Sequence, residues 1–271
     1  MNETRRITLM AGGILLLIAA GGVYFFWPSQ RPPDALLPQA ESAPLAEAPA
    51  TTTAGNVASE PPPDHYPLPA APAPAAPLPA LTDSDGPFSA ALGEIADAGL
   101  LQRALVSEQL IRRLVATVDN LPRERLAVND RAFRRVPDAF MVKSRDGSYT
   151  LNPANEARYV PLVLLANTAG ASNAARLYLR FHPLFDKAYR ELGYPDRHFN
   201  DRLVQVIDHL LATPEITGSI ELVQPKVFYQ FADPALESRS AGQKMLIRMG
   251  TVNAAQVKAW LRTFRAGIIG S

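Results

Sequence analysis

Apolar side chains recur with helical spacing along most of the chain after Phe88. Between Leu100 and Asn120 they fall every three or four residues, and the arginines of this segment lie on the opposite side. The pattern predicts an amphipathic helix that ends at Leu121-Pro122, because proline cannot continue a helix. Its expected buried positions are Leu101, Leu105, Leu110, Ile111, Leu114, Val115 and Val118.

The same periodicity predicts five further helices, most of which carry recognisable start or stop residues. Pro161 and Pro183 lie inside two of them, and we expect a distortion at the first and a kink or a split at the second. Gly193 and Gly250 are typical helix ends. The predicted starts are Asn152 with Pro153 at the first helical position, Ser172, Asn200, Ser240 in a capping box with Gln243, and Asn253.

Strands are predicted only in short, local pairs. Residues 140–144 and 149–151 flank Asp146-Gly147, which is a strong signal for a hairpin turn. Residues 220–223 and 227–231 form a second candidate pair. We therefore predict a mainly α fold, a helical bundle with one or two short β-hairpins.

The most hydrophobic stretch of the chain precedes this domain. Residues from Ile7 to Trp27 carry no charge, and about 20 such residues can cross a bilayer as a helix. A cleaved signal peptide is the alternative, but this stretch is long and ends in four aromatic residues before Pro28. Arg5 and Arg6 precede it, so the positive-inside rule predicts a cytoplasmic N-terminus and a periplasmic C-terminal domain in a bacterial cell.

Prolines are concentrated between the hydrophobic stretch and the helical region. Sixteen of the 25 prolines lie in residues 28–87, which therefore cannot form helices or central strands. The predicted organisation is a cytoplasmic N-terminus (1–6), a transmembrane helix (7–27), a disordered Pro/Ala-rich linker (28–87) and a soluble helical domain (88–271). The 184 residues of that domain suffice for a core without metal or disulfide support.

Composition excludes several kinds of site. The chain has no cysteine, and therefore no disulfide, thiolate zinc site or cysteine nucleophile. Charge is segregated: residues 28–87 hold seven acidic residues and one arginine, whereas residues 88–271 hold 24 basic and 18 acidic residues. The basic domain either gains only solubility from this charge or contacts an anionic surface or polymer.

The common catalytic motifs are missing as well. The chain contains no P-loop, no G-x-S-x-G, no H-E-x-x-H and no strand-linked G-x-G-x-x-G. This removes the direct indications of nucleotide, serine-hydrolase and zinc-peptidase chemistry. We expect no cofactor and no bound metal.

The densest group of chemically capable side chains lies in residues 198–209, HFNDRLVQVIDH. Helical spacing places Asp201, Asp208 and His209 on one polar face, where two carboxylates and a histidine could act as acid and base or hold a metal. An amphipathic helix also needs a polar face for structural reasons, and an acid near its start is favourable. Both interpretations stay open, and these three residues are the candidate catalytic group of the enzymatic one.

Arginines form a second candidate group. Seven of them fall within 24 residues, and guanidinium groups bind carboxylates and phosphates in a planar, bidentate manner. Four acidic residues are interleaved with them, which favours internal ion pairs as the alternative. The candidate binding residues are Arg112, Arg113, Arg158 and Arg202. The seven clustered arginines are Arg112, Arg113, Arg123, Arg125, Arg131, Arg134 and Arg135.

Long stretches of the domain resemble a known bacterial family. They are LFDKAYRELGYPDRHFNDRLVQVIDHLLATPE (Leu184 to Glu215), QPKVFYQFADPALESRSAGQKMLIRMG (Gln224 to Gly250) and NAAQVKAWLR from Asn253. The chain resembles DUF3014, a family of uncharacterised membrane-anchored proteins. The resemblance implies a short cytoplasmic end, one membrane helix, a proline-rich linker and the domain, and it supplies no catalytic or binding residues.

These features lead to two functional expectations. The first is a non-enzymatic binding or scaffolding module of the cell envelope, held in the bacterial inner membrane by Ile7 to Trp27. Its partner would be another envelope protein or the cell-wall polymer, and nucleic acid is not expected outside the cytoplasm. The alternative is a periplasmic cell-wall hydrolase or other envelope enzyme.

Overall fold

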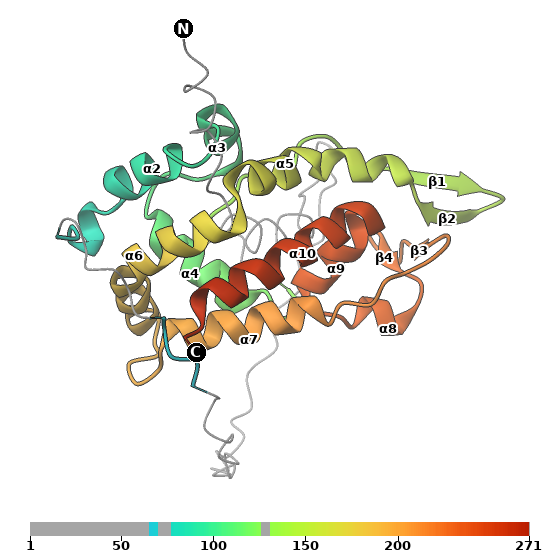
Figure 1. The fold of residues 1–271 in the computed structure, drawn as a ribbon. Coiled ribbons are helices and arrows are strands. Elements are labelled where there is room, and N and C mark those ends of the chain that lie inside the picture. The colour runs from blue at the N-terminus through green and yellow to red at the C-terminus, as the bar shows by residue number, and fades with distance from the viewer. Residues whose placement is uncertain (1–64, 70–76, 126–130, 271) are drawn as a thin grey trace, which may run out of the picture.

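A computed structural model describes residues 65–69, 77–125 and 131–270 of the chain. These residues form a mainly helical domain with one small sheet (Figure 1). The helices are η2 (Leu81–Asp83), α2 (Asp85–Gly93), α3 (Ala98–Ala104), α4 (Leu110–Asn120), η3 (Pro153–Tyr159), α5 (Val160–Ala169), α6 (Ala171–Glu191), α7 (Phe199–Leu211), α8 (Pro234–Glu237), α9 (Ala241–Arg248) and α10 (Thr251–Ile268).

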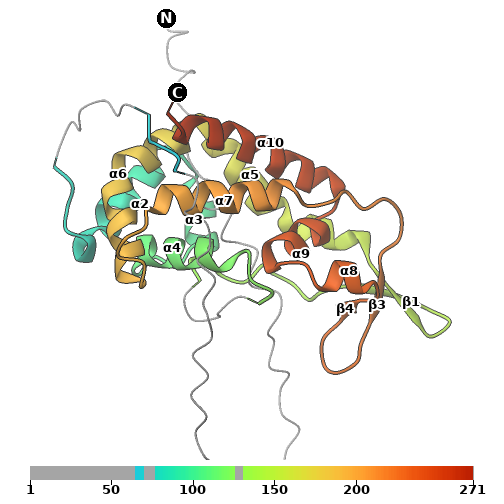
Figure 2. The same ribbon diagram turned by 90° about the horizontal axis from the view of Figure 1, so that it is seen from below.

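The C-terminal helix α10 organises the bundle. It packs against α5, α6 and α7, while α4 packs against α6 and α7 from the other side (Figures 1 and 2). The approach of α6 and α10 is close, because a Cβ atom added at Gly267 would lie 2.7 Å from Cβ of Ala175. A glycine at this position therefore sets the distance between the two helices.

An aromatic cluster fills the centre of the bundle. Tyr178 and Phe185 of α6 lie against Phe199 at the start of α7, and Phe264 of α10 contacts Tyr178. All four side chains are fully buried. Aromatic side chains bury more area than any other type, so this cluster is a large part of the stabilising free energy.

A four-stranded antiparallel sheet lies at one end of the bundle (Figure 2). Its order is β1 (Val142–Arg145), β2 (Ser148–Leu151), β3 (Glu221–Val223) and β4 (Gln230–Phe231). The predicted hairpin at Asp146-Gly147 is confirmed, with φ of 50° and 79° at the two turn residues. The second predicted pair is also present, and pairing of β2 with β3 joins the two hairpins into one sheet. A small separate core beneath it contains Leu222, Phe231, Leu236 and Ile247.

The first predicted helix is wrong in one respect. The structure divides the segment from Leu100 to Asn120 into α3 and α4, with Leu105 in an extended conformation between them. Leu105 pairs with Phe133 in an isolated antiparallel bridge, and Gln109 has a φ of 51° just before α4. A contact distant in sequence therefore outweighs the continuous helical periodicity.

The other helices follow the predicted order with changes at their starts. Helix α6 runs without interruption past Pro183, so the predicted split does not occur. His198, and not Asn200, lies at the N-cap position of α7, and α10 begins two residues before Asn253. The caps at Asn152 and Ser240 are confirmed, because each side-chain oxygen accepts a backbone N–H of the following turn.

The folded domain begins earlier than Phe88. The prolines of residues 65–69 and 77–87 predict that these residues belong to the linker, yet Leu81 and Ser84 are buried. Leu78 and Leu68 also pack against the main core. The linker boundary is thus corrected for these residues, since a few apolar side chains between prolines are enough to hold them on the domain.

The expected membrane helix from Ile7 to Trp27 lies outside the described residues, as does most of the expected linker. Within the described ranges, no helix combines the length and the apolar character that a bilayer crossing requires.

Candidate functional site

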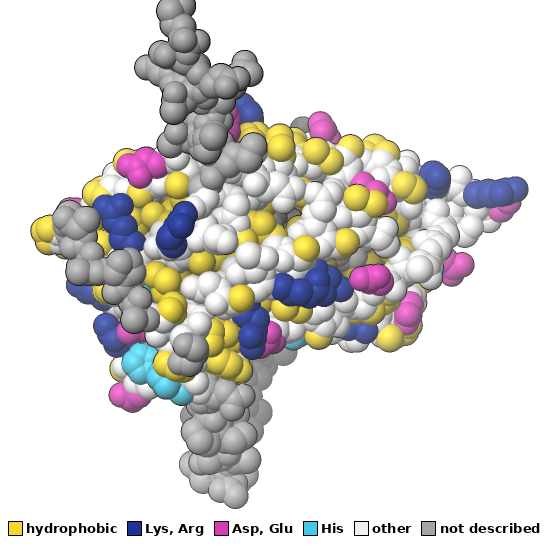
Figure 3. Space-filling model, in the orientation of Figure 1, with side chains coloured by type: hydrophobic (Ala, Val, Ile, Leu, Met, Phe, Trp, Pro, Cys, Tyr) yellow, Lys and Arg dark blue, Asp and Glu magenta, His cyan; other side chains and the backbone are white. Residues whose placement is uncertain are grey.

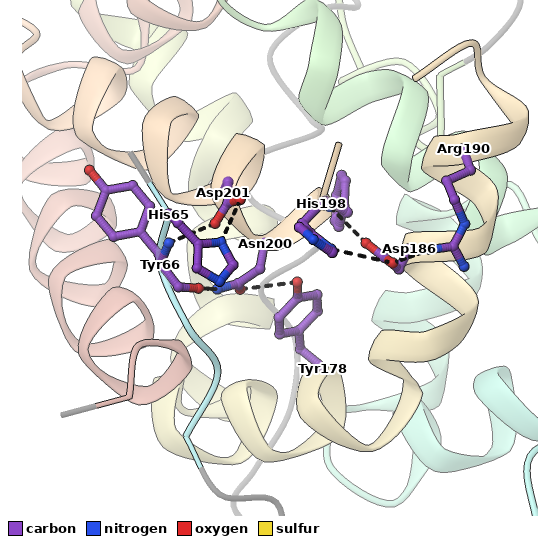
Figure 4. Close-up of polar contacts among 9 residues, drawn as sticks. His65, Tyr66, Tyr178, Asp186, Arg190, His198, Asn200 and Asp201 are labelled. Carbon is purple, nitrogen blue, oxygen red and sulfur yellow. Dashed lines mark hydrogen bonds and ion pairs between the residues drawn. The ribbon is translucent and has the colours of Figure 1, made fainter. Parts of the chain in front are cut away.

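Asp201, the first candidate acid, holds the N-terminal segment on the domain. We call residues 65–69 the strap. Oδ1 of Asp201 accepts the backbone N–H of Tyr66 at 2.7 Å, and Oδ2 lies 3.1 Å from Nδ1 of His65 (Figure 4). Both oxygens of this buried carboxylate are therefore engaged by the strap.

Further contacts fix the strap at the junction of α7 and α10. Nδ2 of Asn200 donates to the carbonyl of Tyr66 at 2.8 Å, and the backbone N–H of Gly270 donates to the carbonyl of Pro67 at 2.7 Å. The guanidinium of Arg265 lies 5.8 Å from the centre of the Tyr66 ring. The N-terminal extension thus joins the domain beside the last residues of α10.

The other two candidate catalytic residues have separate partners. Arg265 donates to both carboxylate oxygens of Asp208, at 2.7 and 2.9 Å. Nε2 of His209 lies 2.7 Å from the hydroxyl of Ser240, the N-cap residue of α9. Burial lowers the pKa of His209, and the charges of Arg202 and Arg239 lower it further. Asp201, Asp208 and His209 lie on one helix, as predicted, but each interacts with a different element.

A second polar group surrounds the start of α7. Asp186 of α6 accepts the backbone N–H of Phe199 at 2.9 Å and an N–H of Arg190 at 2.6 Å. Its Oδ2 is 3.8 Å from Nδ1 of His198, whose ring centre lies 5.5 Å from that of His65 (Figure 4). Asp186 thus satisfies an N–H that the helix itself leaves unpaired, which is a structural role.

Arg112 and Arg202, two of the candidate binding arginines, form ion pairs within the domain. Arg112 donates to Glu191, and Nε of Arg202 donates to Oδ1 of Asp119 at 2.8 Å. The buried Asp119 also accepts from Arg123 and from the hydroxyl of Tyr194. This carboxylate therefore joins α4, α7 and the loop before α7.

The remaining candidates, Arg113 and Arg158, bind backbone carbonyls. Arg113 donates to the carbonyls of Glu108 and Arg131. Arg158 is buried and donates to the carbonyls of Pro137 and Asp138, at 3.0 and 2.7 Å. Burial lowers its pKa. Both guanidinium groups thus secure the irregular segment between α4 and β1.

Charges on the molecular surface are mixed. On the face seen in Figure 3, Lys and Arg side chains lie scattered among Asp and Glu side chains. In the described ranges, no group of three or more His, Asp or Glu residues is placed to hold a metal ion. The residues singled out from the sequence therefore do not meet at one site.

A cleft of about 580 Å³ lies at the opposite end of α7 from the strap. Its walls are formed by β1, β2 and η3, the loop of residues 213–220 that follows α7, the end of α9 and the first two turns of α10. Helix α7 has 13 residues and is therefore about 20 Å long, with the strap at its first turn and the cleft beyond its last. The cleft is thus remote from the point where the N-terminal extension joins the domain.

Two buried cations line this cleft. Arg248 and Lys258 are each only 6% exposed. The guanidinium of Arg248 lies 4.9 Å from the centre of the Phe231 ring and 5.9 Å from that of Phe140, and burial lowers its pKa. Nζ of Lys258 donates to the carbonyl of Thr213, just beyond the end of α7. Burying two positive charges is costly unless an anion or good acceptors are nearby.

The N-terminus of α10 also borders the cleft. Gly250 precedes it with a φ of 82°, and no side chain caps this helix end. Glu156 lies directly over the glycine, since a Cβ atom added at Gly250 would be 2.3 Å from Cδ of Glu156. Only a glycine fits here, both for its φ and for the space.

Sequence reasoning missed the cleft residues. Arg248 follows the apolar run Met245 to Ile247, and Lys258 adjoins the buried Val257, so each cation lies next to residues expected in the core. A cation next to core positions was the available signal for a buried charge. This signal does not reveal which other segments of the chain surround the cation.

The comparisons with known proteins identify a family but name no activity. A family model described as "Protein of unknown function (DUF3014)" matches residues 110–265, which is more than half of the chain. No match was found among curated proteins or solved structures. The resemblance inferred from the sequence is confirmed, and the chain belongs to the DUF3014 family.

Proposed function

We propose that this chain is a non-enzymatic binding or scaffolding module of the bacterial envelope, held in the inner membrane by a helix from Ile7 to Trp27. Its N-terminus lies in the cytoplasm, and its helical domain lies in the periplasm at the end of a proline-rich linker. The uncharged apolar stretch and the preceding arginines support the anchor and its orientation.

The position of the cleft is the observation that carries the binding role. The strap joins the N-terminal extension to one end of α7, and the cleft opens at the other end. A module anchored through its N-terminal extension would thus keep its concave surface away from its attachment. The partner is another envelope protein or the cell-wall polymer.

The side-chain contacts favour binding over the alternative of an envelope hydrolase. Acid–base catalysis needs its groups within reach of one substrate atom. Asp201, Asp208 and His209 are instead engaged by the strap, by Arg265 and by Ser240. If all three are replaced with alanine and the domain stays folded, an unchanged cellular phenotype would rule out the hydrolase, whereas loss of a measured turnover would support it.

The proposed orientation is tested with two reporters fused after Ser271. We expect activity from a reporter enzyme that works only outside the cytoplasm, and none from a cytoplasmic reporter at the same position. The reverse result would overturn the orientation. Fusions that begin at residue 28, without the hydrophobic stretch, are the matched control and should lose export.

The binding role is tested by crosslinking the full chain in its native membrane and identifying its neighbours. A shorter chain that ends at Pro69 keeps the proposed anchor and linker without the domain, and serves as control. We expect an envelope protein or cell-wall fragments with the full chain alone. Identical neighbours for both chains, with no co-sedimentation with the cell wall, would contradict the proposal.

A further inference from the structure

The ammonium group of Lys258 has more hydrogen-bond donors than its contacts within the protein use. A lysine ammonium has three N–H donors, and the carbonyl of Thr213 is its one acceptor among the described residues. No carboxylate of the described ranges forms an ion pair with it. Buried polar groups are nearly always paired, so the other two donors call for acceptors within the cleft.

The hydrogen bond from Lys258 to Thr213 has a structural explanation, but that explanation does not account for the burial of the lysine. A cation next to the end of a helix is favourable, and Thr213 lies just after α7. That role needs one donor and could be met by an exposed lysine. It does not explain why Lys258 is 6% exposed and borders an open cleft.

The charges around the cleft restrict the kind of ligand. Lys143, Arg248 and Lys258 contribute three positive charges, and Glu156 and Glu215 contribute two negative ones. A polyanion such as nucleic acid or an anionic lipid surface would meet both carboxylates. A small ligand with one carboxylate can reach the buried ammonium and avoid them.

The loop after α7 adds a second recognition element. Among the described residues, the backbone groups of 215–219 make no hydrogen bond, although this segment forms one wall of the cleft. Gly218 has a φ of 93°, so the loop bends there. Free N–H and C=O groups along a wall can pair with the backbone of an extended peptide.

We propose that the cleft binds the free carboxyl end of a short peptide. The ammonium of Lys258 takes the carboxylate, and residues 215–219 pair with the peptide backbone. Arg248, at the end of α9, adds a second buried positive charge to the lining of the cleft. This inference rests on the proposed binding role and specifies its ligand, which comes either from the C-terminus of a protein or from the peptides of the cell wall.

The test is an NMR titration of the full-length chain in detergent micelles. The probe is tri-L-alanine with a free carboxylate, compared with the same peptide as its C-terminal amide. We expect shifts at Gly218 and Thr251 with the acid, and at least about tenfold weaker binding of the amide, because a charged hydrogen bond is lost. Equal binding of the two, or no binding of either, would overturn the proposal.

Two pairs of variants assign the effect to the cleft. Lys258→Met removes the ammonium and should weaken binding of the acid by about tenfold, while Lys187→Met on the exposed side of α6 should not. If Lys258→Met fails to fold, Ala255→Glu and Ala255→Gln replace it, because Ala255 is exposed and lines the cleft. The glutamate should repel the acid more than the glutamine does. Equal affinity of the two Ala255 variants would then contradict the proposal.

The two sources of the ligand are separated by a third peptide. Tri-alanine ending in two D-residues represents a cell-wall peptide, and the all-L peptide represents a protein C-terminus. Tighter binding of either free acid supports the proposal and identifies the source. Because these measurements need no cell, a negative result would leave the crosslinking test of the envelope role intact.

Discussion

The carboxylate of Asp201 accepts the backbone N–H of Tyr66 at 2.7 Å, across 135 positions of sequence. This contact joins the N-terminal extension to the start of α7. The same carboxylate lies 3.1 Å from Nδ1 of His65. A residue whose type and spacing favour catalysis thus has a clear role in attaching the extension to the domain.

Asp201→Ala should loosen the strap at Tyr66 and leave the bundle folded. The Tyr66 N–H would lose its charged acceptor, so its hydrogen exchange should become about tenfold faster or more. Exchange of this amide, followed by NMR or mass spectrometry, is the measurement. Asp196→Ala is the control, because Asp196 is exposed just before α7. Equal exchange rates in the two variants would show that Asp201 does not hold the strap.

Asp119→Ala should be among the most destabilising changes at a polar position. The Asp119 side chain is 3% exposed and pairs with Arg202 and Arg123. Removing one partner of a buried pair costs about 3 kcal/mol, to be measured by chemical denaturation of the full chain. Glu191→Ala removes the exposed pair with Arg112 and should cost at most about 1 kcal/mol. A loss for Asp119→Ala no larger than that of the control would refute this prediction.

Gly250→Ala should destabilise the domain for two separable reasons. Its φ of 82° is unfavourable for alanine by about 1–2 kcal/mol, and the new Cβ would meet Glu156 at 2.3 Å. Glu156→Ala should therefore restore part of the stability lost by Gly250→Ala. The free energies of unfolding of the two single variants and the double variant give this coupling. If the free-energy changes of the two single variants add up to that of the double variant, Glu156 does not clash with the new Cβ.

Stability should fall as the pH drops below about 6.5, partly through His209. Burial lowers the pKa of His209 from its ordinary value of 6.5, so below that pH the unfolded chain binds the proton more readily than the folded one. The contribution of neutral His209 to the stability is fully present above pH 6.5 and is lost as the pH falls toward the pKa of His209 in the folded state. His209→Gln should flatten this part of a plot of melting temperature against pH. An unchanged slope would exclude His209 as a contributor.

Local sequence signals located most helices and both hairpins. The caps at Asn152 and Ser240 and the turn at Asp146-Gly147 are correct because each depends on neighbouring residues alone. The break at Leu105 was missed because it depends on Phe133, far along the chain. The strap was missed for a similar reason, since its proline content is typical of a linker and its binding site is made by α7 and α10.

The candidate site shows the same division. The sequence by itself determined that Asp201, Asp208 and His209 share a helix, because helical periodicity follows from the order of the residues. It also determined the mainly α class and the family resemblance. Only the tertiary structure decided the partners of Asp201, Asp208 and His209. Only the tertiary structure brought Lys258, Arg248 and residues 215–219 around one cleft. The physical reason is that ion pairs and cavities form between segments distant in the chain, where packing of the whole core sets which groups meet.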